Sequence, residues 1–280
     1  MTSLLMRSIK FLVGLGFVGV LLIALWGTIS GLIREGTPQT AEQALHEHPK
    51  ELHLPSNGPF GKFDLAQLQR GFKVYEKVCA QCHSLNLVSF RELAGLGYNE
   101  AEIKKIAKDW PVKQPVFDNK AGTWGERDNT PADRFPKVYY AANGTPPDLS
   151  LITKARHDGA AYVYSLMVGY TEKPDAEGAK KFPEALKSPE GLHFNKYFAN
   201  LHLAMPAPLT DAQIDTVKYT DGTPTTVDQM AQDVSAFLVW TAEPTMQQRH
   251  RFGVAVLIFL IFATILGYGA YRNVWRGMKH

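Results

Sequence analysis

Two long apolar runs set the first constraint on how this chain of 280 residues can fold. Residues 11–33 form a run of 23 residues and residues 252–271 form one of 20 residues, and neither contains a charged side chain. As helices rising 1.5 Å per residue, both could cross the hydrocarbon core of a bilayer, which is about 30 Å thick. Because a buried helix of a soluble core rarely runs so far without a charge, the sequence predicts two membrane spans.

The first run could also belong to a cleaved signal peptide, because Arg7 and Lys10 precede it. It is long for the apolar part of such a signal, and no A-x-A-like cleavage site follows Ile33, which favours a retained anchor. Basic residues before the first run and after the second place both ends in the cytoplasm. The middle of the chain is therefore predicted to be exported.

These runs divide the chain into five segments. We predict an N-terminal transmembrane helix or signal-anchor (1–33), a linker (34–57), an exported domain (58–249), a C-terminal transmembrane anchor (250–272) and a basic cytoplasmic tail (273–280). The net charge of +3 resides in the two ends, and residues 34–249 together carry −3. This balance gives no reason to expect nucleic acid as a partner.

The exported segment has a helical pattern interrupted by long loops. Apolar periodicity and capping residues predict helices over residues 64–78, 99–110, 160–170 and 225–241. Proline and glycine recur over 111–150 and 171–210, so we expect loops there, and a short strand and turn at 217–223. The sequence therefore predicts a mostly α fold, whose long loops need something to pack on or a function to serve.

The only two cysteines of the chain lie in Cys79-Ala80-Gln81-Cys82-His83, which is the C-x-x-C-H attachment signature of c-type haem. Two thiols three positions apart can reach the two vinyl groups of one porphyrin, and the adjacent histidine then lies under the iron. A redox C-x-x-C belongs in a thioredoxin-like βαβ pattern, which is missing here, and a zinc site needs two further ligands. A disulfide has no use for His83. We therefore predict one haem c, bound covalently through Cys79 and Cys82 and ligated by His83.

Met205 is the candidate for the sixth iron ligand. It lies in Ala204-Met205-Pro206-Ala207-Pro208, where the prolines exclude a helix and favour a rigid loop that can direct one thioether at a metal. It also precedes the last amphipathic helix, as expected when an early and a late helix clasp a haem. Met167 falls within a predicted helix and is interpreted as a core residue. His193 and His202 remain rival ligands.

Haem propionates need cationic or hydrogen-bonding partners. Arg156 follows a turn at residues 146–150 that would suit a haem edge. From its sequence position alone, however, an arginine is usually a surface residue.

Further motifs, taken together in their order along the chain, make about residues 58–276 resemble the cytochrome c1 family. These motifs include Arg70-Gly71-Phe72, Pro146-Pro147-Asp148-Leu149-Ser150, Ala155-Arg156-His157, Gly169-Tyr170, Met205-Pro206, Asp221-Gly222-Thr223-Pro224 and Glu243-Pro244. The resemblance implies a class I cytochrome c core with large loop insertions, plus transmembrane helices. Some bacterial relatives carry an extra disulfide in this domain, for which this chain has no cysteine left.

The resemblance also implies roles for single residues. Cys79 and Cys82 would hold the haem, and His83 and Met205 would ligate its iron. Arg156 would meet a propionate.

Pro147 matches a family proline that packs on the haem beside the proximal histidine. The N-terminus does not resemble a mitochondrial presequence. We therefore expect a bacterial protein in the cytoplasmic membrane, with its haem domain on the periplasmic side.

The function implied by the resemblance is electron transfer within a respiratory or photosynthetic quinol oxidoreductase. The subunit would accept one electron from the Rieske iron–sulfur protein and pass it to a soluble or anchored cytochrome c, without a substrate-converting site of its own. Cytochrome b and membrane lipid would be its other partners. Two alternatives remain open at this point: a stand-alone membrane-anchored electron shuttle, and a haem enzyme such as a peroxidase, which needs an open sixth site and a distal acid–base group.

Overall fold

The computed structural model describes residues 2–35, 39–140, 144–172 and 174–278. Parts of the predicted linker (36–38) and of the predicted tail (279–280) lie outside the described residues. The chain divides into two compact units, Met1–Ala44 and Leu45–His280, and each is described by itself.

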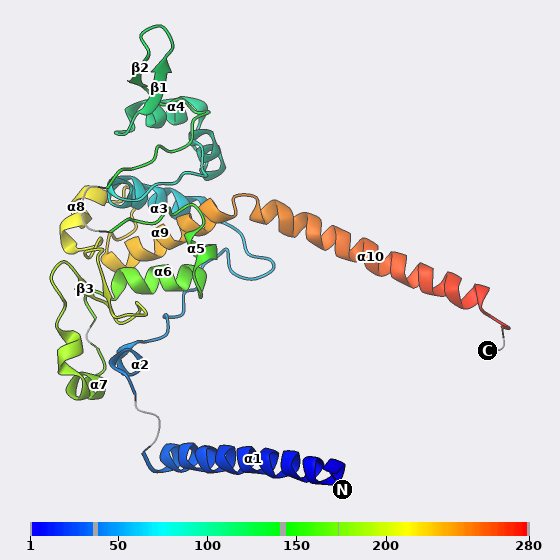
Figure 1. Ribbon diagram of the computed structural model, residues 1–280. Coiled ribbons are helices and arrows are strands. Elements are labelled where there is room, and N and C mark those ends of the chain that lie inside the picture. Colours follow the sequence, from blue (N-terminus) through cyan, green and yellow to red (C-terminus); the bar gives the residue numbers. More distant parts are fainter. Residues whose placement is uncertain (1, 36–38, 141–143, 173, 279–280) are drawn as a thin grey trace. The chain divides into compact units, whose positions relative to one another are not determined.

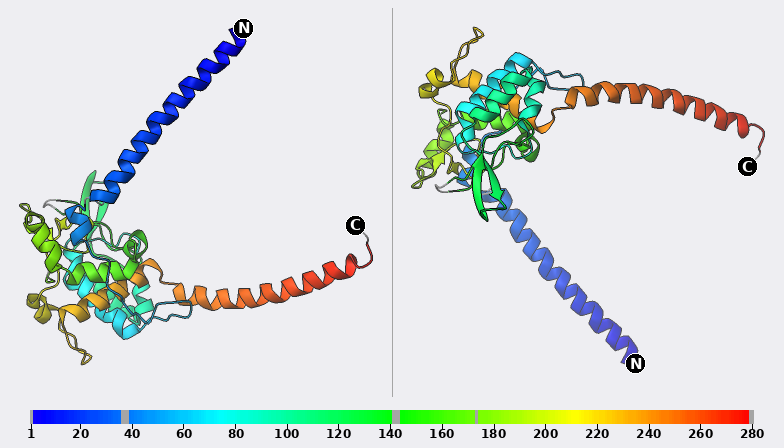
Figure 2. Two further views of the ribbon diagram at one scale, coloured as in Figure 1. Left: turned by 90° about the horizontal axis from the view of Figure 1, so that it is seen from below. Right: turned by 90° about the horizontal axis from the view of Figure 1, so that it is seen from above.

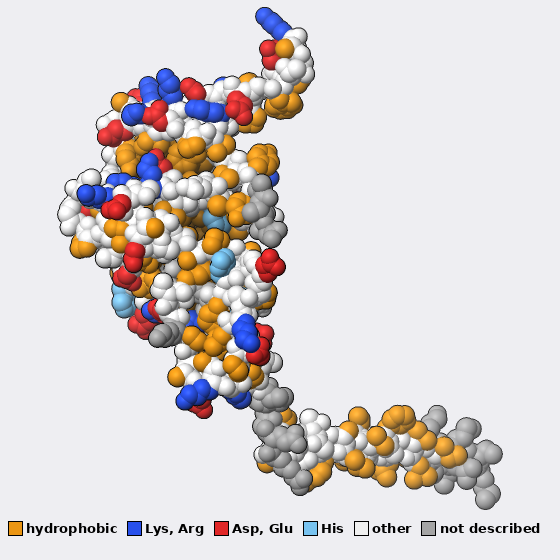
Figure 3. Space-filling view, turned by 90° about the vertical axis from the view of Figure 1, so that its left-hand side faces the viewer, with side chains coloured by type: hydrophobic (Ala, Val, Ile, Leu, Met, Phe, Trp, Pro, Cys, Tyr) orange, Lys and Arg blue, Asp and Glu red, His pale blue; other side chains and the backbone are white. Residues whose placement is uncertain are grey.

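The first unit consists mainly of one long helix, α1 (Thr2–Glu35), followed by the start of α2 (Ala41–Leu45). Apolar side chains from Phe11 to Ile33 are exposed along α1, and Figure 3 shows them as hydrophobic surface. The second unit ends in the long helix α10 (Met246–Val274), shown in orange to red in Figure 2. Its apolar stretch is likewise exposed. By length and composition, both helices could cross a membrane.

The core of the second unit is built on the crossing of α3 (Leu65–Lys77) and α9 (Val227–Ala242), with α6 (Gly159–Val168) packed against α9 (Figure 1). The close approach depends on Gly71. A Cβ atom added there would lie 2.1 Å from the backbone oxygen of Asp233 on α9. Glycine is thus the residue that lets the two helix backbones meet.

An ion cluster reinforces the same crossing. Arg70 donates from Nε to Asp233 at 2.8 Å and from Nη1 to Asp221 at 2.7 Å. The Asp233 side chain is fully buried, so its charge depends on Arg70 as a partner. The guanidinium also lies over the ring of Tyr219, 5.6 Å from the ring centroid.

Aromatic side chains fill the space beside the crossing. Phe72 and Tyr75 of α3 and Phe237 of α9 pack with Trp110 and Phe135, with ring centroids 4.9 to 6.5 Å apart. Trp110 follows α4 (Glu100–Asp109), and η2 (Phe90–Leu96) completes this side. Charges of both signs cover the outer face of α4 (Figure 3).

The remaining elements are short. They are η1 (Cys79–Gln81), the hairpin β1 (Gln114–Asp118) with β2 (Thr123–Arg127), α5 (Ile152–Ala155), α7 (Ala176–Lys181), η3 (Pro183–Leu186), the antiparallel pair β3 (His193–Phe194) with β4 (His202–Leu203), η4 (Asp211–Gln213) and α8 (Ile214–Val217).

The predicted helices are present, with bounds shifted by a few residues at most. Asp64 and Thr226 cap α3 and α9 as their positions indicated, and Asn99 forms a capping box at the start of α4. The predicted loop at 171–210 contains the short elements α7, η3 and the pair β3–β4. Two further expectations were wrong. Residues 114–127 form a hairpin within the predicted loop, and the predicted strand at 217–219 is replaced by the end of α8.

The reason for the second error is a missed helix start. Thr210 and Gln213 form a capping box that opens η4 and α8, and Val217 is then buried near α3. The strand preference of Val217 and Tyr219 is a weaker signal than this cap and burial together.

We predict that Gly71→Ala destabilises the haem-loaded chain. The added Cβ must displace the α9 backbone, so the free energy of unfolding should fall by about 2 kcal/mol, within the range for overpacked cores. Denaturant unfolding followed by circular dichroism measures it. Gly95→Ala is the matched control, because its Cβ would meet Trp240 at an ordinary 3.4 Å. Equal stability of the two variants would contradict the role of Gly71.

Candidate haem-binding site

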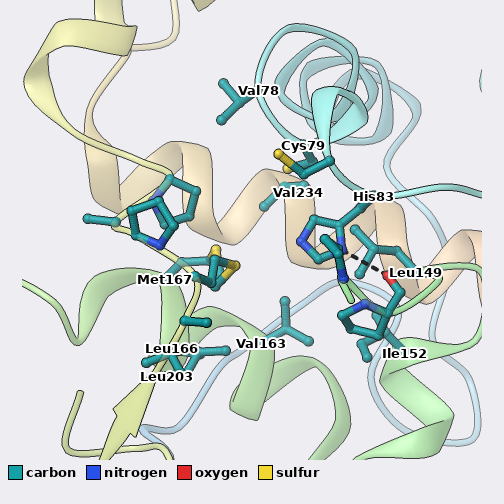
Figure 4. Close-up of a pocket in the computed structure, with 18 of the residues that line it drawn as sticks. Val78, Cys79, His83, Leu149, Ile152, Val163, Leu166, Met167, Leu203 and Val234 are labelled. Carbon is teal, nitrogen blue, oxygen red and sulfur yellow. Dashed lines mark hydrogen bonds between the residues drawn. The ribbon is translucent and has the colours of Figure 1, made fainter. Parts of the chain in front are cut away.

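A cavity of about 520 Å³ lies between the turn that follows α3, the helices α6 and α9, and the loops around them. All six residues singled out from the sequence line it: Cys79, Cys82, His83, Pro147, Arg156 and Met205. Most of the other lining side chains are apolar, and Figure 4 shows several of these, among them Val163, Leu203 and Val234, around the space. The volume is in the range of cofactor pockets.

The end of α3 delivers both thiols to this cavity. The helix stops at Lys77, and η1 turns the chain so that the amides of Cys82 and His83 donate to the Cys79 carbonyl at 3.1 and 2.8 Å. Both cysteines are unpaired and partly exposed. Burial raises the pKa of the Cys79 thiol to about 12. Redox C-x-x-C pairs instead contain a thiol of lowered pKa, so this environment does not suit a thioredoxin-like role.

His83 is held at the ring and at the backbone. Its Nδ1 lies 2.8 Å from the Pro147 carbonyl, drawn as a dashed line in Figure 4, and the Tyr75 hydroxyl donates to the His83 carbonyl at 3.0 Å. Because a carbonyl only accepts, Nδ1 carries the proton and Nε2 keeps a free lone pair. Burial lowers the pKa of His83, against the opposing effects of Pro147 and Asp148. The result is a neutral imidazole, the form that binds metals.

The segment that holds His83 is itself fixed to the C-x-x-C-H turn. The Asp148 carboxylate accepts from the amide of Asn86 at 2.7 Å and from that of Ser150 at 2.9 Å. The amide of Leu149 donates to the Ser84 carbonyl at 2.9 Å. These bonds place Pro147 beside His83, although 64 positions separate them in the sequence.

Two methionines reach the cavity from different elements. Met205 comes from the loop between β4 and η4, and residues 203–208 all line the cavity. Met167 comes from α6 and points into the same space (Figure 4), and it also packs against the hydrophobic core, as interpreted from the sequence. The position of Met167 in a predicted helix could not show whether its side chain would line a cavity or be buried in the core.

Neither of the two rival histidines is among the described residues that line the cavity. The Nε2 of His202 lies 3.0 Å from the Ala185 carbonyl and its Nδ1 lies 3.3 Å from Ser188. Both ring nitrogens are thus engaged away from the cavity. His193 is exposed on β3.

Arg156 and Tyr162 bring polar groups to the cavity lining. The guanidinium of Arg156 is exposed, and among the described groups it donates only to the carbonyl of Ala155. Burial raises the pKa of Tyr162, while the nearby charge of Arg156 acts in the opposite direction. Tyr162 was not among the site residues predicted from the sequence, although the motif Tyr162-Val163-Tyr164 that contains it matches the family.

The residues present fit a haem c. The cavity combines paired thiols, a neutral imidazole, two thioethers and apolar walls, with a cation available for propionates. Early and late helices that cross beside a C-x-x-C-H turn, in a mostly helical domain, define a class I c-type cytochrome core.

Residues 54–278 match the Cytochrome C1 family. The chain therefore belongs to the cytochrome c1 family, whose members are haem subunits of cytochrome bc1 complexes.

Relatives at about 40% identity extend this match over most of the chain. A protein of Bradyrhizobium diazoefficiens named cytochrome b/c1 is 44% identical over 239 residues, which are 78% of this chain and 34% of that protein. Cytochrome c1 of Rhodospirillum rubrum is 40% identical over 260 residues, 88% of this chain and 93% of the relative. Mitochondrial cytochrome c1 1 heme protein of Arabidopsis thaliana is 39% identical over 276 residues, 94% and 85%. The chain thus spans about a third of the first relative and most of the other two.

Proposed function

We propose that this protein is the electron-transferring haem subunit of a quinol–cytochrome c oxidoreductase. One haem c is bound covalently through Cys79 and Cys82, with His83 and Met205 as the iron ligands. The protein takes one electron from a Rieske iron–sulfur protein and passes it to a soluble or anchored cytochrome c. The observation that carries this proposal is that both thiols, a neutral imidazole and a thioether line one apolar cavity.

The bound haem supplies a one-electron couple, and the chain's own residues set the conditions for it. The Pro147 carbonyl fixes the proton and the plane of His83. Apolar walls such as Val163 and Leu238 exclude water, which favours a high potential together with a thioether ligand. Arg156 and Pro147 serve the haem edge, the former as a propionate partner and the latter as a packing surface.

Membrane attachment and assembly with cytochrome b complete the proposal. The name of the Bradyrhizobium diazoefficiens relative joins cytochrome b and c1 in one protein. The two helices long and apolar enough to span a membrane support anchoring at both ends of the chain. Basic residues at the N-terminal flank support a periplasmic haem domain in a bacterial cytoplasmic membrane.

Covalent attachment predicts the behaviour of cysteine variants. Cys79→Ala or Cys82→Ala leaves at most one thioether, and haem retention should be impaired, since the chain has no other cysteine. The double variant should release all its haem on acid–acetone extraction, while the parent keeps it. Haem that stays with the double variant through extraction would contradict covalent attachment.

Met205→Leu keeps the bulk of the side chain but removes the sulfur. The reduction potential should fall by an amount on the order of hundreds of millivolts, within the roughly 0.8 V that axial ligands control. The ferric sulfur-to-iron charge-transfer band should disappear, and carbon monoxide should bind the reduced protein. A redox titration beside the parent measures the shift.

Met167→Leu is the matched control, because this second thioether lines the same cavity. It should leave the band and most of the potential unchanged. If instead Met205→Leu changes neither and Met167→Leu abolishes the band, then Met167 is the ligand and the assignment of Met205 is wrong.

Two retained anchors predict that truncation after residue 248 does not release the haem domain from membranes, because the span at 11–33 remains. Membrane fractionation of the truncated protein tests this. Mass spectrometry of the purified parent should find a mature N-terminus before residue 11. A mature N-terminus beyond Ile33 would refute the first anchor.

A further inference from the structure

Apart from the fixed φ angles of its two prolines, the loop that carries Met205 has few means of holding its own conformation. Pro206 and Pro208 lack amide hydrogens, and residues 204–209 lie outside every helix and strand. Among the described residues, one hydrogen bond reaches this loop: the hydroxyl of Tyr170 donates to the Met205 carbonyl at 2.8 Å. The backbone of the candidate ligand itself is thus tied to a side chain 35 positions earlier.

Tyr170 is placed firmly, because the residue before it is locked in the core. A Cβ atom on Gly169 would lie 2.6 Å from Oδ1 of Asn195 and 2.7 Å from the ring of Tyr197. Asn195 is fully buried and donates to the Leu166 carbonyl at 2.8 Å. The end of α6 is therefore fastened to the turn from which the chain returns towards Met205.

Further contacts stabilise that turn. The amide of Tyr197 donates to the side chain of Asn195 at 3.0 Å, and the Tyr197 hydroxyl donates to Glu172 at 3.0 Å. Glu172 also pairs with Lys196 at 3.0 Å. The position of Tyr170 is thus fixed by packing and hydrogen bonds around it. Its acceptor, the Met205 carbonyl, lies in a loop that lacks such contacts among the described residues.

The Tyr170 hydroxyl is available as a donor over the whole physiological pH range. Burial, helped by the neighbouring Tyr162, raises its pKa above the ordinary tyrosine value. Because a carbonyl oxygen can only accept a hydrogen bond, the hydroxyl of Tyr170 must be the donor in this contact.

We propose that Tyr170 is a positioning residue for the sixth ligand: its hydroxyl holds the Met205 carbonyl so that the thioether stays directed at the iron. This inference rests on the proposed function, in which Met205 ligates the haem. Without the bond, the loop gains freedom and an added ligand competes more successfully with the thioether.

The test uses the full-length, haem-loaded, ferric protein and imidazole as the competing ligand. Tyr170→Phe keeps the ring and its packing but loses the donor. The affinity for imidazole, followed by loss of the ferric charge-transfer band, should rise about fivefold, the effect of one neutral hydrogen bond. The matched control is Tyr164→Phe, on the neighbouring helix α6, whose hydroxyl donates to Asp228 of α9 at 2.5 Å rather than to the Met205 loop. This control should bind imidazole like the parent.

Met205→Leu distinguishes a failure of the proposed ligation by Met205 from a failure of the positioning role of Tyr170. It should raise the imidazole affinity strongly, which is followed here by the shift of the main haem absorption band because the charge-transfer band is already absent. Tyr170→Phe added to it should have no further effect, because no thioether remains to be positioned. If Met205→Leu leaves the band and the affinity unchanged, the proposed ligation fails. If Met205→Leu acts as expected but Tyr170→Phe binds imidazole like the parent, or no more tightly than Tyr164→Phe, the positioning role of Tyr170 is overturned.

Discussion

The crossing of α3 and α9 at Gly71 is the contact on which the rest of the haem domain depends. It brings two backbones closer than any side chain at that position would allow, and the buried pair of Arg70 with Asp233 fixes the contact. Because α3 ends at Lys77, two positions before Cys79, the crossing also sets where the C-x-x-C-H turn begins. The opposite helix contributes Val234 and Leu238 to the same cavity.

The rest of the site is formed by loops around the crossing of α3 and α9, and each loop is held in place by its own contacts. The Pro147 segment is fastened to the C-x-x-C-H turn by backbone bonds and by Asp148. The Met205 loop lacks such a network among the described residues and depends on Tyr170. Rigid placement of both candidate ligands fits electron transfer, since little then has to move when the iron changes its charge.

The sequence predicted more of the site than of the loops around it. Cysteine spacing, an adjacent histidine and a methionine between prolines each have local meaning, so the site residues could be named before any fold was known. Met167 and Tyr162 could not be distinguished in this way, because a helix gives the same pattern whether its inner face meets the core or a cavity. The hairpin at 114–127 was missed because its cross-strand pair, Phe117 with Trp124, is exposed and carries no burial alternation.

The sequence by itself determined the two candidate membrane spans, the capped core helices, the C-x-x-C-H turn and, through ordered motifs, the family. These are properties of short segments, whose hydrophobic period, caps and ligand spacing act over one or a few turns of chain. Only the tertiary structure decided that the Pro147 carbonyl meets His83, and that the Tyr170 hydroxyl meets the Met205 carbonyl. Such contacts join residues 64 and 35 positions apart. They depend on how packed helices and loops meet in space, which local sequence patterns do not record.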